Sequence, residues 1–166
     1  MERIELKKEN CPFCADKINN SAFIESPNFL VIYNNAPILP GHSLVIPKNH
    51  IESLLELNQT ELFEFIQLSI KATKIILKVF KADSFNWTIQ EKPEAGQTVS
   101  HLHLHIFPRH DKDLPNPGDW YPILKSIEET QYNNIDSKTR PKYTNEEIIN
   151  IVNHIKAQIL LNGDNI

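Results

Sequence analysis

Short apolar runs separated by turn-forming residues dominate the first two thirds of the chain. Each run is four to nine residues long and is rich in β-branched or aromatic residues, and Ser, Pro, Asn and Gly lie between the runs. This pattern is typical of short strands in a sheet. The expected strands cover residues 22–25, 29–33, 43–47, 85–90 and 99–107. The loop 34–42 (NNAPILPGH) has two prolines and one glycine, which break any regular element.

Two segments have helical spacing instead. The first is capped by Asn58 with Glu61 three residues later, and Leu62, Ile66, Ile70, Leu77 and Phe80 recur along it to residue 81. The second begins at Thr144 with Glu147 completing a capping box, and Gly163 ends it. Its apolar stripe, expected to be core or subunit contact, consists of Ile148, Val152, Ile155 and Ile159.

These elements predict an α+β fold with a mainly antiparallel sheet of about five strands, one long helix and a C-terminal helix. The segment 111–142 is polar, has four prolines and shows no sustained period. We therefore expect residues 1–110 to form the main domain. Residues 111–166 would form an irregular extension and a helix that packs on the same domain.

Composition and charge narrow the function classes. The formal net charge of −4 gives no support for a surface that binds nucleic acid polymers or anionic membranes. The N-terminus lacks the apolar core of a secretory signal, and no apolar run approaches the ~18 residues that span a bilayer. A soluble, cytoplasmic protein is expected.

The stretch 96–110 (GQTVSHLHLHIFPRH) holds four of the seven histidines of the chain. On a strand, His101, His103 and His105 would share one face, with same-face neighbours ~7 Å apart. That spacing is awkward for one metal ion unless the strand bends, and it suits three groups in a row along an extended substrate. The alternative is a solvent face that happens to be rich in histidine. Arg109 could add a charge or lie on the surface.

The run HLHLHIF resembles the histidine-triad (HIT) superfamily. With Gln90 upstream, EAGQTVSHLHLHIFPR is similar to the fragile-histidine-triad branch of dinucleoside polyphosphate hydrolases. The resemblance covers about residues 11 to 110, so it places a HIT domain in residues 1–110 with a HIT-like fold. It also implies a homodimer and a nucleotide or dinucleotide substrate.

The resemblance implies a role for each matching residue. His103 would attack the α-phosphate and carry a nucleotidyl group, and a neutral imidazole suits this because its ordinary pKa is ~6.5. His105 would assist the leaving group, and His42 would orient the site. The substrate would be held by Gln90, Gln97 and Thr98 at the phosphates and by Asn34 at the ribose, although Asn34 is also a common turn residue.

The pair Cys11 and Cys14 (CPFC) contains the only cysteines, too few for a disulfide framework. Tetrahedral zinc needs four N or S ligands, and His50 and His101 are the available partners. This set resembles zinc-containing bacterial HIT proteins and the zinc site of galactose-1-phosphate uridylyltransferase. It implies a structural zinc, with a reduced pair without metal or a redox pair as alternatives.

The combination of features leaves the substrate open. The fragile-histidine-triad branch lacks the cysteine pair, and related enzymes with the same triad hydrolyse nucleoside phosphoramidates or act as nucleotide phosphorylases. A protein that binds nucleotides without turnover is a further alternative. The aromatic residues of the extension could cover a bound base or simply pack; they are Trp120, Tyr121, Tyr132 and Tyr143.

Overall fold

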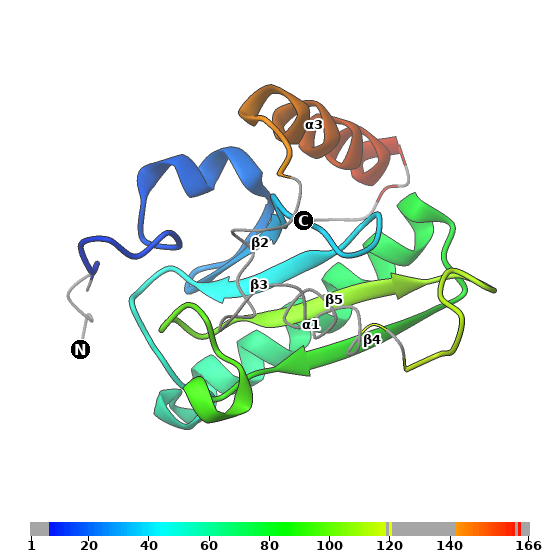
Figure 1. Ribbon diagram of the computed structural model, residues 1–166. Coiled ribbons are helices and arrows are strands. Elements are labelled where there is room, and N and C mark those ends of the chain that lie inside the picture. Colours follow the sequence, from blue (N-terminus) through cyan, green and yellow to red (C-terminus); the bar gives the residue numbers. More distant parts are fainter. Residues whose placement is uncertain (1–6, 119, 121–141, 162, 164–166) are drawn as a thin grey trace.

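The computed structural model describes residues 7–118, 120, 142–161 and 163. Its five-stranded antiparallel sheet has the strand order β1-β2-β3-β5-β4 (Figure 1). The strands are β1 (Ala22–Glu25), β2 (Phe29–Tyr33), β3 (Ser43–Pro47), β4 (Ser84–Ile89) and β5 (Leu104–Arg109). The first three have the predicted bounds, and the predicted α+β class with an antiparallel sheet is confirmed.

The histidine-rich strand differs most from its prediction. It was expected over 99–107, but β5 begins only at Leu104. Before it the chain bends, because the amide of His101 donates to the carbonyl of Val99 at 2.7 Å and the amide of Leu102 donates to the carbonyl of Ile51 at 2.6 Å. These bonds take the place of hydrogen bonds to a neighbouring strand, so the alternation of side chains between the two faces of the sheet does not extend back to His101.

The helices begin where capping residues predicted them. In α1 (Gln59–Phe80), Asn58 and Glu61 form a complete capping box, and in α3 (Asn145–Leu161) the amide of Glu147 donates to Oγ1 of Thr144. The four stripe residues of α3 are all buried, as expected. Short 3₁₀ helices complete the fold; they are η1 (Asp16–Ser21), η2 (Leu54–Glu56) and η3 (Pro93–Ala95).

In α1, the apolar spacing of the sequence marks the helix but not its buried face. Leu62, Ile66 and Ile70 are 39%, 38% and 44% exposed. The face that packs on the sheet carries Phe65, Leu68, Ala72, Ile75 and Ile76. Because α1 is apolar on two sides, periodicity alone could not choose between them.

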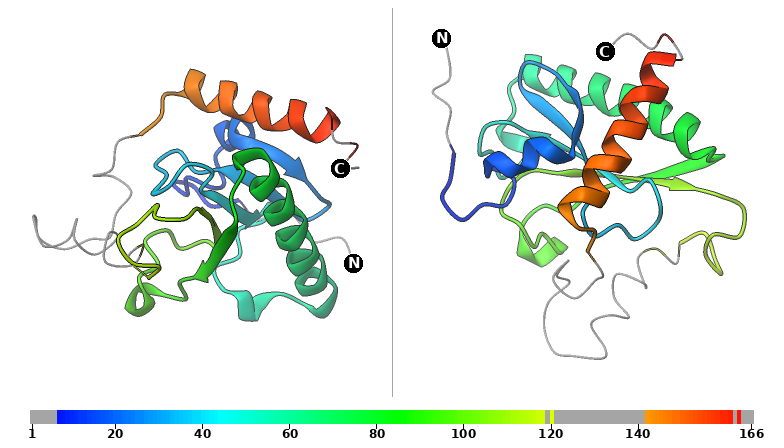
Figure 2. Two further views of the ribbon diagram at one scale, coloured as in Figure 1. Left: turned by 90° about the vertical axis from the view of Figure 1, so that its right-hand side faces the viewer. Right: turned by 90° about the horizontal axis from the view of Figure 1, so that it is seen from above.

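Each face of the sheet has its own apolar cluster. Alternate residues of β2, β3 and β5 pack with α1 and α3 in the main core, and both helices lie against this cluster (Figures 1 and 2). The opposite face carries Leu30, Ile32, Leu44 and Ile46, against which Phe13 and Ile18 pack. Since neighbouring strand residues alternate faces, His105 and Phe107 lie on this second face.

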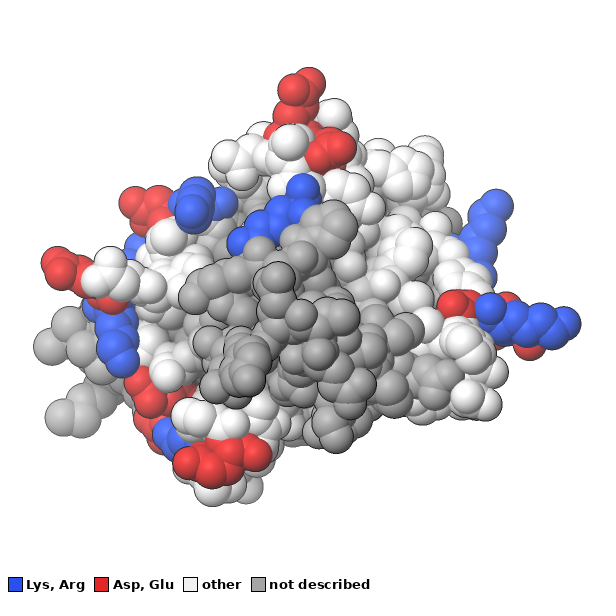
Figure 3. All heavy atoms as spheres, in the orientation of Figure 1, with Lys and Arg blue, Asp and Glu red and all other residues white. Residues whose placement is uncertain are grey.

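The surface carries charges of both signs. On the face in Figure 3, Lys and Arg side chains stand beside Asp and Glu side chains around the rim. Exposed pairs include Lys7 with Asp16 at 3.2 Å and Lys112 with Asp111 at 3.4 Å. Among the described residues, no helix is long and apolar enough to cross a membrane. Tyr121, Tyr132 and most of the expected irregular extension lie outside the described residues.

Candidate active site and metal group

Sheet register brings His42 and His105 together. Leu44 of β3 pairs with His105 of β5, and the chain turns into β3 directly after His42. Nε2 of His42 lies 2.8 Å from Nδ1 of His105. Gly41 makes this turn possible with φ +86°, a conformation that favours glycine. A Cβ there would lie 2.6 Å from Cγ of Pro108, so the backbone must pass close to β5.

Hydrogen bonds from and to the backbone select the tautomers of His42, His103 and His105. The amide of Ile38 donates to Nδ1 of His42 at 3.2 Å, so this nitrogen accepts and Nε2 carries the proton. Nε2 of His42 then donates to Nδ1 of His105, which leaves the His105 proton on Nε2. In His103 the arrangement is reversed, because Nδ1 donates to the carbonyl of His101 at 2.6 Å. Nε2 of His103 therefore carries the lone pair.

Burial keeps His103 neutral. Its side chain is almost fully buried, and this desolvation lowers the pKa of His103, although the hydrogen bond to the His101 carbonyl and the charge of Glu91 oppose the shift. A neutral imidazole with a free lone pair is a nucleophile. The ring centroids of His103 and His105 are 4.9 Å apart, so one phosphate group can contact both rings.

A cavity of about 940 Å³ opens beside these rings. Its apolar wall is formed by Phe13, Ile18, Ile32 and Leu44, and its polar wall includes His103, His105, Asn34, Gln90 and Thr98. Lys142 and Tyr143, just before α3, line the end near Asn34 and Asn35. The amide of Tyr143 donates to the carbonyl of Asn35 at 2.9 Å, which anchors this segment to the loop after β2.

The predicted substrate residues take different positions. Gln90 and Thr98 line the cavity. Asn34 also lines it, while its Oδ1 accepts from the amide of Ala36 as in a turn. Gln97 does not line the cavity. Its amide group instead donates to the carbonyl of Glu52 and accepts from the amide of Lys92, both at 2.9 Å.

Arg109 and Trp120 also lie away from the cavity. Arg109 is only 7% exposed, against the expectation of a surface arginine, because it donates from Nε and Nη2 to both carboxylate oxygens of Asp113. Trp120 stacks on Phe107 with ring centroids 5.5 Å apart. Trp120 and Tyr143 are the two described residues among the four aromatic residues that could cover a base, and of these two Tyr143 lines the cavity.

The four predicted metal ligands come together. The side-chain atoms that Cys11, Cys14, His50 and His101 offer to a metal all lie within 4.8 Å of one another. Tetrahedral zinc with ordinary bond lengths would place S and N ligand atoms about 3.6 Å apart. The S–Nδ1 distances here are 3.4 Å for Cys11–His101, 3.4 Å for Cys14–His50 and 3.7 Å for Cys14–His101. The donor set and its spacing fit zinc.

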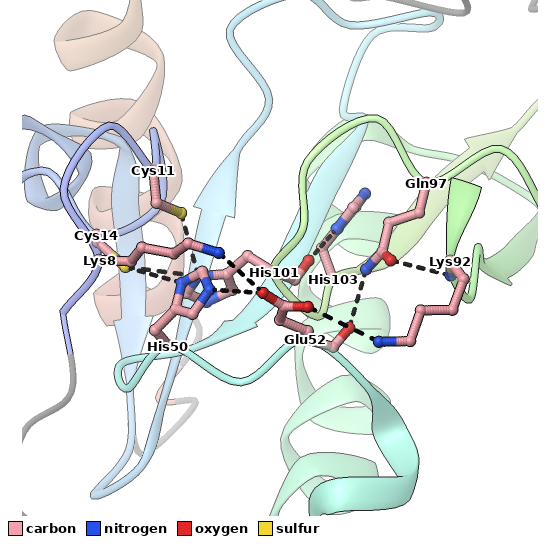
Figure 4. Close-up of polar contacts among 9 residues, drawn as sticks. All are labelled: Lys8, Cys11, Cys14, His50, Glu52, Lys92, Gln97, His101 and His103. Atoms are coloured by element: carbon pink, nitrogen blue, oxygen red, sulfur yellow. Dashed lines mark hydrogen bonds and ion pairs between the residues drawn. The ribbon is translucent and has the colours of Figure 1, made fainter.

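Both histidines of the group present Nδ1 to the cysteines (Figure 4). Nε2 of His101 donates to the carbonyl of Pro47 at 2.9 Å, and burial lowers the pKa of His101 to about 4, so the ring is neutral. Nε2 of His50 lies 3.3 Å from Oε1 of Glu52. Burial raises the pKa of the Cys11 thiol, the opposite of the shift that activates redox thiols.

Sequence reasoning missed two residues beside the rings. Phe13, between the two cysteines, meets the rings of His101 and His103 edge-on at 5.5 and 5.4 Å and lines the cavity. Its position between the two predicted metal ligands of CPFC was the sequence feature that could have indicated a place near the site. Glu52 contacts His50 and also Lys8 and Lys92, which are distant in sequence, and nothing in the local pattern marks it.

Comparison with known proteins places this geometry in a family. The HIT domain family matches residues 15–112. The chain is 38% identical over 111 residues to the asymmetrical bis(5'-nucleosyl)-tetraphosphatase of Schizosaccharomyces pombe, covering 67% of this chain and 61% of that protein. It is 32% identical over 116 residues to the bis(5'-adenosyl)-triphosphatase of Dictyostelium discoideum, covering 68% of this chain and 78% of that protein.

A solved structure shows the same fold. The diadenosine triphosphate hydrolase of Plasmodium falciparum, in complex with cyclomarin A, superposes with a TM-score of 0.67 at 26% identity, covering 96% of this chain and 88% of that one. The match to the S. pombe protein spans less than two thirds of its length. The family match nevertheless covers more than half of this chain, including the cavity-lining strands and all three triad histidines. The chain belongs to the HIT domain family.

Proposed function

We propose that this chain hydrolyses dinucleoside polyphosphates by nucleophilic attack of His103 on the α-phosphate. The observation that carries the proposal is that two adjacent rings are opposite tautomers: Nε2 lacks the proton in His103 and carries it in His105. Because Nδ1 of His103 donates to the His101 carbonyl, Nε2 of His103 has a lone pair for attack. Because the Ile38 amide donates to His42 and His42 donates to Nδ1 of His105, the proton of His105 is on Nε2. The relatives named as hydrolases of such substrates support the choice of substrate.

The reaction would proceed in two displacements. Nε2 of His103 forms a bond to the α-phosphorus while the bond from phosphorus to the bridging oxygen breaks. Nε2–H of His105 donates to that oxygen as its charge develops, and the remaining nucleotide leaves. Water then attacks the same phosphorus and loses a proton to solvent, the P–N bond breaks with its electron pair returning to Nε2, and a mononucleotide is released with neutral His103 restored. Each displacement is easier than direct attack by water.

The substrate would lie along the cavity with its ribose and base at the Asn34 end. The apolar wall of Phe13, Ile18, Ile32 and Leu44 suits a base, and Gln90 and Thr98 reach the phosphates next to His103. Gln97 is better placed as a structural residue, because both ends of its amide already bind the backbone.

Trapping of the intermediate tests the covalent route, because acid-labile, base-stable nucleotide is expected on the quenched enzyme. In ¹⁸O-water the label is expected in the mononucleotide, which would show that the α-phosphorus is the atom attacked. His103→Ala should lower kcat by roughly 10⁴-fold or more. His154→Ala, an exposed histidine on α3, is the matched control and should keep full activity. Full turnover by His103→Ala would remove His103 as the nucleophile.

A product assay separates the alternatives for the same site. Dinucleoside polyphosphates, nucleoside phosphoramidates and nucleotide sugars are compared with and without added phosphate. The proposal expects the highest kcat/KM for dinucleoside polyphosphates, with no dependence on added phosphate. A preference for phosphoramidates would indicate a phosphoramidase, a requirement for phosphate would indicate a phosphorylase, and tight binding without turnover would indicate a nucleotide-binding protein.

We infer further that Cys11, Cys14, His50 and His101 bind one structural zinc ion. Four protein ligands would fill a tetrahedral shell and leave no open position for water, so the ion would tie the N-terminal segment to the sheet. Protein purified without chelator should contain about one zinc per chain, and Cys14→Ala should lose it. Less than about a tenth of an equivalent in the wild-type protein would refute the site.

We also propose that the chain forms a homodimer. In the single chain, β4 is an edge strand, and the second apolar face of α1 with Leu62, Ile66 and Ile70 is uncovered, as is Phe85 of β4. Light scattering should give twice the mass of one chain, and Ile70→Glu should shift it to the monomer. A monomeric wild-type protein would contradict this. We further propose that residues 1–110 form the HIT domain and that, within residues 111–166, helix α3 packs on this domain through its buried stripe.

A further inference from the structure

Glu52 joins two parts of the molecule that the sequence keeps apart. Its Oε1 lies 3.3 Å from Nε2 of His50 and 3.1 Å from Nζ of Lys8, and its Oε2 lies 3.7 Å from Nζ of Lys92. Its backbone carbonyl accepts from the side chain of Gln97 at 2.9 Å. Figure 4 shows Glu52 between the cysteine–histidine group and the loop of Lys92 and Gln97.

On the metal side, Glu52 contacts a ligand and the segment that carries the cysteines. A carboxylate that accepts from the outer nitrogen of a ligating histidine fixes the tautomer and raises the basicity of the metal-binding nitrogen. Here the accepted proton is on Nε2 of His50, and Nδ1 faces Cys14. Lys8 belongs to the turn in which the amide of Cys11 donates to the Lys8 carbonyl at 3.2 Å.

On the cavity side, the loop held by Glu52 has an unfavourable backbone conformation. Lys92 has φ +70°, which is uncommon for a residue with a side chain. The carbonyl of Lys92 accepts from the amides of Ala95 and Gln97, and its amide donates to Gln97 Oε1. The residues enclosed by these bonds include Pro93 to Gly96, which line the cavity. Such strain persists where surrounding contacts enforce it, often at functional sites.

We propose that Glu52 is a positioning residue that couples the metal group to the cavity loop 92–97. Its carboxylate orients His50 toward the metal and holds Lys8 and Lys92, and its carbonyl fixes Gln97. Metal binding and loop order then stabilise each other, so the zinc group acts on the substrate cavity as well as on the N-terminal segment. This inference rests on the proposed zinc site.

The test measures zinc affinity by chelator competition and loop order by hydrogen exchange. Glu52→Ala should bind zinc roughly 10- to 100-fold more weakly than the wild type, and Glu52→Gln, which keeps an acceptor oxygen, should recover part of that loss. Because coupling is reciprocal, Gln97→Leu should also weaken zinc binding, although Gln97 touches none of the four ligands. Glu56→Ala, an exposed glutamate on η2, is the matched control and should stay within about twofold of wild type.

Hydrogen exchange measures the order of the loop 92–97, which the proposed coupling links to zinc binding. The amides of residues 92 and 94–97 should exchange faster when zinc is removed from the wild type, and they should also exchange faster in zinc-saturated Glu52→Ala than in the zinc-saturated wild type. Unchanged zinc affinity in Glu52→Ala would overturn the role of its carboxylate. An exchange rate in 92–97 that does not change when zinc is removed would overturn the coupling. Wild-type protein that binds no zinc would overturn the metal site itself, an outcome distinguishable from both.

Discussion

Replacing Asp113 by Asn tests how much a buried ion pair stabilises the end of β5. The carboxylate accepts from Nε and Nη2 of Arg109 at 2.8 Å each and from the amide of His110 at 3.0 Å. The two side chains are 9% and 11% exposed, so solvent screens the pair weakly. The hydrogen bond from Arg109 is the largest cause that lowers the pKa of Asp113 from 3.8 to about 2.

The magnitude and the pH window follow from that shift. At about 1.4 kcal/mol per pKa unit, the shift corresponds to about 2.5 kcal/mol in the free energy of unfolding, and a small discount for screening by solvent leaves about 2 kcal/mol. Because the folded-state pKa is depressed, this contribution is fully present above the unfolded value of 3.8. It is lost as the pH falls from there through the folded value near 2.

Urea denaturation of both proteins at several pH values measures the effect. Asp113→Asn should be about 2 kcal/mol less stable at pH 7, and the difference should shrink below pH 4. Contributions shared by both proteins, including acid release of the proposed zinc ion, cancel in the difference. Asp111→Asn is the control, because that carboxylate is 83% exposed beside Lys112 and should change stability by less than about 0.5 kcal/mol. Equal stability at pH 7, or a pH-independent difference, would refute the reasoning.

Three further substitutions probe the scaffold of the site, each measured by denaturant unfolding. Gly41→Ala should lower the free energy of unfolding by about 2 kcal/mol or more, because φ is +86° and the new Cβ would meet Pro108. Activity should also fall because His42 follows directly, and an unchanged kcat would contradict that link. Ile155→Ala should cost about 2–5 kcal/mol because the side chain is fully buried, and a loss below 1 kcal/mol would mean that α3 is loosely packed. Asn58→Ala should cost about 1 kcal/mol through loss of the α1 cap, with no change in KM.

Much of the secondary structure was predictable because its signals are local. Three strands have the expected bounds, and both helices begin at their capping residues. The stripe of α3 from Ile148 to Ile159 is buried as its period predicts. Spacing indicated only that one metal ion does not easily bind all three triad histidines, whereas the separate roles proposed for His101 and His103 were implied by the resemblance to the HIT superfamily.

Other features depend on contacts between segments far apart in sequence, and only the tertiary structure decided them. Packing on the sheet selected the Phe65 face of α1 over the equally apolar Ile66 face. The bend before β5 turned His101 toward the cysteines, and main-chain partners from other segments determined which ring nitrogens carry protons. Periodicity describes one segment at a time, whereas tautomers, the position of Gln97 and the contacts of Glu52 depend on which backbone groups folding brings alongside.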